Sequence, residues 1–408
     1  MIKEQTLINI KAKWLFYITS FFNSFSLGVT GPLLIVYLLL LNINPAQIGL
    51  LLAVERIAAI IFDAPTGTFA DRYGRKKSLL VCFFLNFLIF IIWFVTKDFY
   101  LLLILSMSLG ISSTFQSGAE DSLIIDNLKL EANDRKRTKI FSRLAIFGNF
   151  GFLVGGLMAM VITNYSIRFI WLVAGLINLF IFSLYGIFIK ENFKGDILIK
   201  TQNNVKKILK QTKENLAFSL RSKTIAPFFI ITIVFGLTIA IYSLSYPIIF
   251  KDNFNFPIPY FGLLGSSSAA VGILGAYIGE RLTGKNGYYF SIGLSGIALL
   301  LLFFIFGLSK NLVFALFIFL MIELAKDSWY PVNQSFFNKF IPSTNRAGIL
   351  SINSTISSLA LAVGEIAAGI ALFCLKPNIL IMIASLLFIF IPLSLRLIKK
   401  ASLEQPKN

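Results

Sequence analysis

The 408-residue chain contains no histidine, only two cysteines, and 19 acidic residues against 37 basic ones. Without imidazole, no nucleophile–histidine pair can form, and any proton uptake by the protein must use carboxylates. Cys82 and Cys374 lie in separate apolar runs, which favours packing roles over a disulfide or metal site. These shortages argue against an enzyme, and no cofactor or bound metal is expected.

Charge of either sign is scarce: 14% of the residues are charged, 57% are hydrophobic, and the mean hydropathy is +0.81. A soluble protein of this length could not bury so much apolar surface, so lipid must surround much of the chain. The net charge of +18 lies in short clusters between apolar runs. This placement indicates a membrane protein and argues against a nucleic-acid partner.

Twelve apolar runs approach or exceed the roughly 20 residues that a helix needs to cross a bilayer. The basic start, 1–13, precedes a run that is too long for a cleavable signal peptide. The polar segment 190–223 separates six runs from six; it is either a short amphipathic helix on the inner surface, around 205–216, or a solvated linker. The expected spans are residues 14–41, 46–70, 79–96, 99–126, 142–163, 169–189, 225–250, 258–282, 286–308, 311–340, 344–374 and 377–396.

The basic residues also predict the orientation of the chain. With both termini inside, the inner segments hold 29 of the 37 lysines and arginines, and the outer loops hold five. Cytoplasmic segments carry such an excess in membrane proteins. We therefore expect a multi-pass protein of the cytoplasmic membrane with both termini in the cytoplasm.

Residues 67–77, GTFADRYGRKK, lie between the second and third expected spans. They resemble the loop signature G-x-x-x-D-R-x-G-R-K of the major facilitator superfamily, a family of transporters. Gly67 and Gly74 allow a tight turn where backbones pass closely. A degenerate second copy, GERLTGK at 279–285, falls where a repeated half would place it.

The resemblance implies an all-α membrane fold of twelve transmembrane helices in two six-helix pseudo-repeats. The expected organisation is an N-terminal half, 1–189, a cytoplasmic linker, 190–223, and a C-terminal half, 224–408.

The resemblance also implies a cytoplasmic gate. In the family, the motif aspartate, here Asp71, reaches the N-terminus of helix 11, here near 342–344. Unpaired amides and the helix dipole favour a carboxylate there. The arginine four residues later, Arg75, bridges to an acid at the end of helix 4, here Asp126, unless Asp126 is only a surface charge. The gating candidates are Gly67, Asp71, Arg72, Gly74, Arg75, Lys76 and Asp126.

Ionisable groups inside expected spans are further candidates, because burying one costs several kcal/mol unless it is paired or faces water. In the fourth span, Gln116 and Glu120 are four residues apart and share a helix face, with Asp121 beside them. Many proton-antiporting exporters of the family carry an arginine in this helix. Aligned on Gly110, that position is Ser106.

The tenth span carries Glu323, Lys326, Asp327 and Tyr330, which follow one helical stripe. In the family, helices 1, 4, 7 and 10 line the central cavity, so this stripe is a candidate proton and substrate site. The alternative is a self-neutralised structural cluster. Two further candidate proton sites, in the second and eleventh spans, are Asp63 and Glu365.

The expected spans hold seven acids and three bases, a balance that favours protons and cationic or neutral amphipathic substrates over anions. The expected function is therefore alternating-access secondary transport, with proton-coupled export of amphipathic or cationic small molecules as the first hypothesis. The alternatives are an importer of sugars or other metabolites, a lipid flippase and a non-transporting membrane sensor. The expected partners are a small-molecule substrate, protons and membrane lipids, with the protein acting as a monomer.

Overall fold

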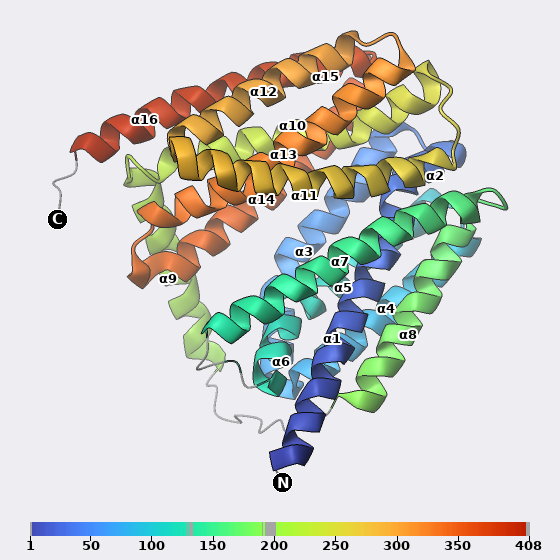
Figure 1. The fold of residues 1–408 in the computed structure, drawn as a ribbon, viewed down its shortest axis with the longest axis vertical. Coiled ribbons are helices and arrows are strands. Elements are labelled where there is room, and N and C mark those ends of the chain that lie inside the picture. The colour runs from blue at the N-terminus through green and yellow to red at the C-terminus, as the bar shows by residue number, and fades with distance from the viewer. Residues whose placement is uncertain (1, 129, 131–133, 190, 192–200, 405–408) are drawn as a thin grey trace. The chain divides into compact units, whose positions relative to one another are not determined.

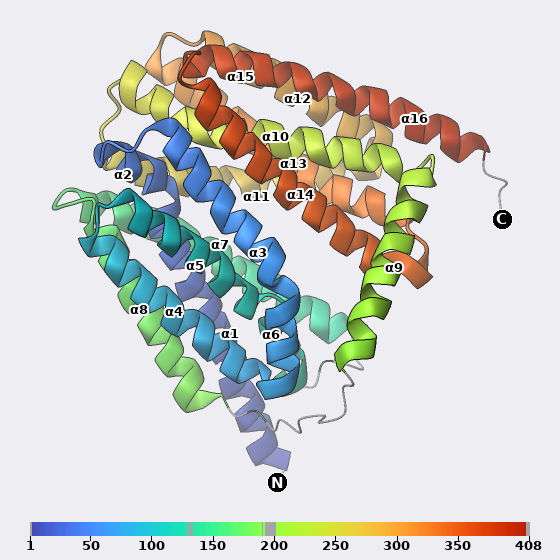
Figure 2. The ribbon, with the colours of Figure 1, turned by 180° about the vertical axis from the view of Figure 1, so that it is seen from behind.

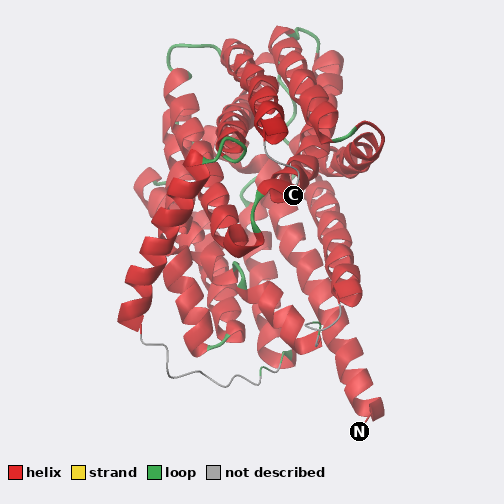
Figure 3. Cartoon of the chain, turned by 90° about the vertical axis from the view of Figure 1, so that its left-hand side faces the viewer, coloured by secondary structure: helices red, strands yellow, loops and turns green. Residues whose placement is uncertain are grey.

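The computed structural model describes residues 2–128, 130, 134–189, 191 and 201–404. Over these ranges the chain forms helices joined by loops, without a strand, which confirms the all-α expectation (Figure 3). The α-helices are α1 (Ile2–Thr30), α2 (Leu34–Leu40), α3 (Pro45–Tyr73), α4 (Arg75–Val95), α5 (Phe99–Gln116), α6 (Ala119–Leu128), α7 (Asp134–Thr163), α8 (Phe169–Phe188), α9 (Thr201–Arg221), α10 (Ala226–Ile248), α11 (Tyr260–Asn286), α12 (Tyr288–Leu308), α13 (Leu312–Phe340), α14 (Arg346–Ala371), α15 (Pro377–Ser385) and α16 (Phe390–Glu404). Short turns of tighter or wider helix are η1 (Gly31–Leu33), η2 (Ile249–Asn253), η3 (Ser343–Asn345) and η4 (Leu386–Ile389).

Within the described residues, 11 segments are long and apolar enough to cross a membrane, and they coincide with eleven of the twelve expected spans. The remaining expected span corresponds to α13, which is 29 residues long. Its three charges, Glu323, Lys326 and Asp327, are clustered near its middle and interrupt the apolar run. In two spans the helix starts well before the apolar run: α1 begins at Ile2 and α7 at Asp134, and each has a polar first part.

The chain forms two compact units. The N-terminal unit comprises Met1–Ile43, Val54–Leu198 and Phe256–Ala269. The C-terminal unit comprises Asn44–Ala53, Ile199–Asn255 and Ala270–Asn408. Each unit thus includes a short stretch from a helix that mostly belongs to the other, namely the start of α3 and the start of α11.

In the N-terminal unit, α1 packs along α7 and α8, and α4 packs between α5 and α8 (Figures 1 and 2). The crossing of α1 and α7 depends on glycine. A Cβ atom added at Gly151 would collide with the backbone carbonyl of Phe21, and one at Gly155 would collide with that of Phe25. The small face of α7 therefore allows the two backbones to approach closely.

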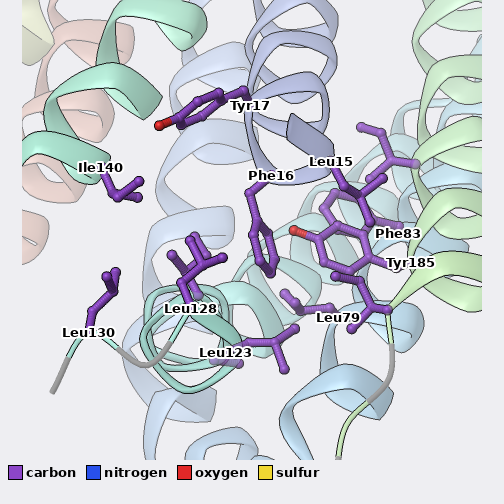
Figure 4. Close-up of a cluster of buried hydrophobic side chains, with 14 of the residues drawn as sticks. Leu15, Phe16, Tyr17, Leu79, Phe83, Leu123, Leu128, Leu130, Ile140 and Tyr185 are labelled. Atoms are coloured by element: carbon purple, nitrogen blue, oxygen red, sulfur yellow. The ribbon is translucent and has the colours of Figure 1, made fainter. Parts of the chain in front are cut away.

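A cluster of buried apolar side chains joins α1, α4, α6 and α8 of the same unit (Figure 4). Phe16 of α1, Leu123 of α6 and Phe83 of α4 pack around Tyr185 of α8, whose ring stacks on that of Phe83 at 5.6 Å between centroids. This packing fixes the ring of Tyr185 while its hydroxyl remains available to a polar partner.

In the C-terminal unit, α10 packs along α14, and α12 contacts both α13 and α15 (Figure 1). Helix α9, in the segment for which a helix and a linker were both considered, packs on α14 through Asn215, which lies against Gly348. Leu216 and Leu220 of α9 are exposed. Residues 190 and 192–200 of the expected linker lie outside the described residues, as do the side chains of 201–209.

We predict that Gly151→Val destabilises the protein by about 1–3 kcal/mol, the usual cost of forcing extra atoms into a packed contact. The control is Gly186→Ala on α8, where an added Cβ would meet only Leu80 at 3.9 Å. Thermal unfolding of the detergent-purified protein measures both. Equal melting temperatures for the two variants would contradict the close α1–α7 crossing.

Candidate functional site

The charged loop between the second and third spans is a single-residue turn. Helix α3 continues to Tyr73, and Gly74 precedes α4 with φ 104°. Only glycine adopts this backbone conformation without strain. Gly67, by contrast, lies inside α3 with open space where a Cβ would be. The expectation that both glycines form the turn is therefore wrong for Gly67.

Arg75, at the start of α4, forms an ion pair with Asp126 near the end of α6. The two side chains are 31% and 50% exposed, and such pairs contribute about 0–1 kcal/mol. The pair joins the two elements that the motif was expected to join. Asp71 and Arg72 are exposed at the end of α3. The expected contact of Asp71 with the start of α14 would join the two units and stays a prediction.

Two further contacts hold α4 and α8 together through their ends. The carboxylate of Glu191 accepts hydrogen bonds from the backbone amides of Arg75 (2.9 Å) and Lys76 (3.0 Å). These amides have no partner within α4 because they open the helix. In the opposite direction, Lys76 Nζ donates to the carbonyls of Gly186 (2.9 Å) and Ile189 (2.6 Å). Each helix end thus receives the charge that its dipole favours.

The second copy of the signature is placed differently from expectation. Helix α11 runs through 279–285 and ends at Asn286, and Gly287 makes the turn into α12 with φ 82°. A positive-φ glycine therefore precedes α12, as Gly74 precedes α4. Gly287 is therefore the counterpart of Gly74 in the second half, and it lies three residues after Gly284, the glycine that the sequence match contains.

The fourth span is broken. Helix α5 ends at Gln116, Gly118 has φ 70°, and α6 starts at Ala119. The break places Glu120 and Asp121 in the first turn of α6, where a negative charge is stabilised by the exposed amides. A shallow polar cavity of about 320 Å³ opens beside the break and is lined by both acids and by Gln116.

The carboxylate of Glu120 is held on both sides. Gln116 Nε2 donates to Oε2 at 2.7 Å, as the four-residue spacing predicts. The hydroxyl of Tyr185 donates to Oε1 at 3.0 Å and itself lies 3.4 Å from Thr19 Oγ1. The arrangement links α1, α5, α6 and α8 through one acid. It can bind or release a proton at a fixed position.

The stripe on α13 separates into two groups. Glu323 is buried and pairs with Lys326, and the hydroxyl of Tyr242 on α10 lies 3.5 Å from Glu323 Oε1. Asp327 packs against Gly272 of α11, where a Cβ would collide with its carboxylate. Tyr330 is 55% exposed and lines a different, uncharged cavity. The structure thus brings together the charged residues, but it does not bring Tyr330 to them.

The last two candidate acids lie apart from these groups. Asp63 is exposed on α3, two residues before Pro65. Glu365 is buried on α14, and its backbone carbonyl faces Gly49 of α3. Across the described residues, no three acidic or cysteine side chains are grouped as metal ligands would be.

Two residues of the site were missed in the sequence. Glu191 could have been found as the first acid after the sixth span, close to a basic helix start. Nothing in the sequence marks Tyr185 as a hydrogen-bond partner of an acid, because a single tyrosine in an apolar helix commonly has only a packing role. Its role depends on the contact between α8 and α6 across 65 residues of sequence.

Residues 16–365 match the family model of the Major Facilitator Superfamily. Among curated proteins, the chain is 27% identical over 367 residues to YxaM of Bacillus subtilis (strain 168), an uncharacterized MFS-type transporter, covering 87% of each. It is 24% identical to multidrug resistance protein 2 of the same organism, with 88% of each chain covered. It is 23% identical to the quinolone resistance protein NorA of Staphylococcus aureus (strain MSSA476), with 89% of this chain and 90% of NorA covered.

Solved structures agree on the fold. A variant of the nucleoside transporter NupG superposes with a TM-score of 0.80 at 14% identity, covering 94% of this chain and 98% of the other. A bacterial homologue of the iron transporter ferroportin, in an inward-facing state, has a TM-score of 0.72 at 13% identity and covers 96% and 99%.

We predict that Glu191→Ala lowers the free energy of unfolding by about 1 kcal/mol, since two amides at the start of α4 lose their acceptor. Glu191→Gln keeps one oxygen acceptor and should lose less. Asp134→Ala, at an acid whose side chain is 92% exposed, is the control for loss of a surface charge. Thermal unfolding in detergent separates the three. An Ala variant no less stable than the control would refute the capping role.

Proposed function

This chain belongs to the major facilitator superfamily, and from this membership we propose that it exports amphipathic small molecules in exchange for protons. The family and the curated relatives make it a transporter. Two of those relatives are named for resistance to drugs, which supports export as the direction. The coupling to protons rests on the acids inside the spans.

The single observation that carries the proton coupling is Glu120. It lies at a break in the fourth span, beside a polar cavity, with one donor on each oxygen. A carboxylate in this position can lose its proton to water while the two hydrogen bonds stabilise the charged form. When it is protonated, it accepts fewer hydrogen bonds and the contact with Tyr185 weakens. Proton binding at Glu120 is thus linked to the packing of α6 against α8.

Asp327 is the second proton candidate. Glu323 and Lys326 neutralise each other in their ion pair, so Asp327 carries the remaining charge of the α13 cluster. Its carboxylate packs against Gly272 of α11, and protonation would change the charge at that helix contact. In this proposal each unit supplies one proton-binding acid, Glu120 or Asp327, which lies at a contact between helices.

We expect Glu120→Gln and Asp327→Asn each to abolish substrate accumulation driven by a pH gradient, at least tenfold below wild type, while substrate binding persists. The measurement uses everted membrane vesicles with an imposed pH gradient and a fluorescent quinolone or a lipophilic cation as substrate. Glu214→Gln, at an exposed acid of α9, is the control. If both variants still accumulate substrate, the coupling acid lies elsewhere.

The motif at the start of α4 is proposed to act as the gate. Arg75 ties this turn to Asp126 on α6, the same short helix that carries Glu120. If a change in the protonation of Glu120 moves α6, it also moves Asp126 relative to Arg75 and weakens this ion pair. Asp71, three residues before the turn, completes the relay by the contact expected in the closed state.

Replacement of Asp71 by asparagine should leave the protein inserted and folded but reduce transport at least tenfold, because the amide cannot supply the charge that a helix N-terminus attracts. The same vesicle assay measures transport, and the elution profile in detergent reports folding. Asp134→Asn, another exposed acid, should transport normally. A turnover of Asp71→Asn equal to this control would contradict the gate.

A further inference from the structure

The C-terminal unit contains a cavity that none of the charged candidates lines. It has a volume of about 270 Å³ and lies between the first half of α10, the last third of α13 and the first half of α14. Typical ligand pockets start near 300 Å³. The size therefore fits a small organic molecule of one or two rings.

The walls of this cavity are polar but uncharged. Its twelve described lining residues are three with side-chain amides, five with hydroxyl groups and four with other aromatic or apolar side chains, and none of them is an aspartate, glutamate, lysine or arginine. A charged ligand would lose its hydration there without gaining an opposite charge, at a cost of several kcal/mol. A neutral ligand avoids this cost. The charge pattern of the cavity therefore selects against ions of either sign.

One wall offers a flat aromatic surface. The rings of Phe235 on α10 and Trp329 on α13 stack with 3.9 Å between their centroids and 13° between their planes, and both line the cavity. Trp329 is 2% exposed, so it supports the ring of Phe235 from behind, and the half-buried Phe235 is the ring on which a flat ligand can stack. Tyr330, the member of the α13 stripe that lies away from the charges, lines the same cavity.

The side-chain amides in the cavity wall can both donate and accept hydrogen bonds to a ligand. Asn333 and Gln334 of α13 and Asn353 of α14 each combine a donor and an acceptor. Asn353 Oδ1 accepts from Thr232 Oγ1 at 2.8 Å, which orients the amide. Asn333 Oδ1 and Trp329 Nε1 are buried and find no partner among the described residues. These two atoms have almost no accessible surface, so the hydrogen bonds to a ligand come from Gln334 and Asn353, which are less buried.

We propose that this cavity binds a neutral, flat heteroaromatic solute that carries adjacent hydrogen-bond donors and acceptors, as a nucleobase or nucleoside does. Side-chain amides pair with such edges through two hydrogen bonds. The inference rests on the proposed transport function and names the substrate class of the transporter. It also decides between the cationic and neutral substrates that the excess of acids in the spans left open.

The test measures binding directly in the full-length protein purified in detergent. Adenosine is the neutral probe and tetraphenylphosphonium the cationic one, and quenching of tryptophan fluorescence reports occupancy. We expect saturable adenosine binding that is lost in Phe235→Leu, which keeps Trp329 as the fluorescent reporter, and at least tenfold weaker binding of the cation. Tighter binding of tetraphenylphosphonium, or adenosine quenching that persists in Phe235→Leu, would overturn the proposal.

An isosteric charge change gives a second readout. Asn353→Asp keeps the oxygen that accepts from Thr232 but places a carboxylate in the cavity. It should weaken adenosine binding at least tenfold, measured by equilibrium dialysis, and strengthen binding of the cation. Asn338→Asp, on α13 but outside the cavity lining, should change neither. Equal adenosine affinities for these two variants would place the site elsewhere.

These experiments can refute the binding site and the proposed transport function independently of each other. Saturable, Asn353-dependent adenosine binding without flux in vesicles would support the site and refute proton-coupled export through it. Flux of a lipophilic cation with no adenosine binding would support export and refute this substrate class.

Discussion

A charged side chain inside a membrane-spanning helix must be paired or hydrated, and this requirement accounts for the polar contacts on which the structure depends. Glu323 is buried at 4% exposure and meets both Lys326 and the hydroxyl of Tyr242. Glu120 meets Gln116 and Tyr185. Glu323 has one partner on its own helix and one on α10, whereas both partners of Glu120 lie on other helices, α5 and α8. Satisfying the charge therefore also fixes the packing of two helices.

At the turn at Gly74, polar contacts at a helix end likewise fix the packing of several helices. Its positive φ allows α3 to pass directly into α4, which brings Arg75 and Lys76 to the first turn of the new helix. Their side chains reach α6 and the end of α8, while Glu191 holds their backbone amides. Because four helices meet at this turn, a change in any of them is transmitted to the others through short, charge-assisted contacts.

The positions of the helices could be predicted from sequence because a bilayer requires apolar length, and this property is local. The Arg75–Asp126 pair could be predicted because the motif carries it. Contacts that depend on three-dimensional packing could not: the hydroxyl of Tyr185 reaches Glu120 only after α8 packs on α4. Helical spacing alone predicts that Tyr330 lies with the charges. In the structure its side chain lies in the cavity of Trp329 instead.

Helix α13 carries both the charged cluster and the aromatic wall of the cavity. Asp327 and Trp329 are two residues apart, and Pro331, which cannot donate a backbone hydrogen bond, lies just beyond them. On the proposed function, a proton at Asp327 and a ligand in the cavity that Trp329 and Tyr330 line act on the same segment of helix. If each favours a different conformation of that segment, each must reduce the affinity for the other by the same factor. Exchange of a proton for a neutral solute then requires no direct contact between them.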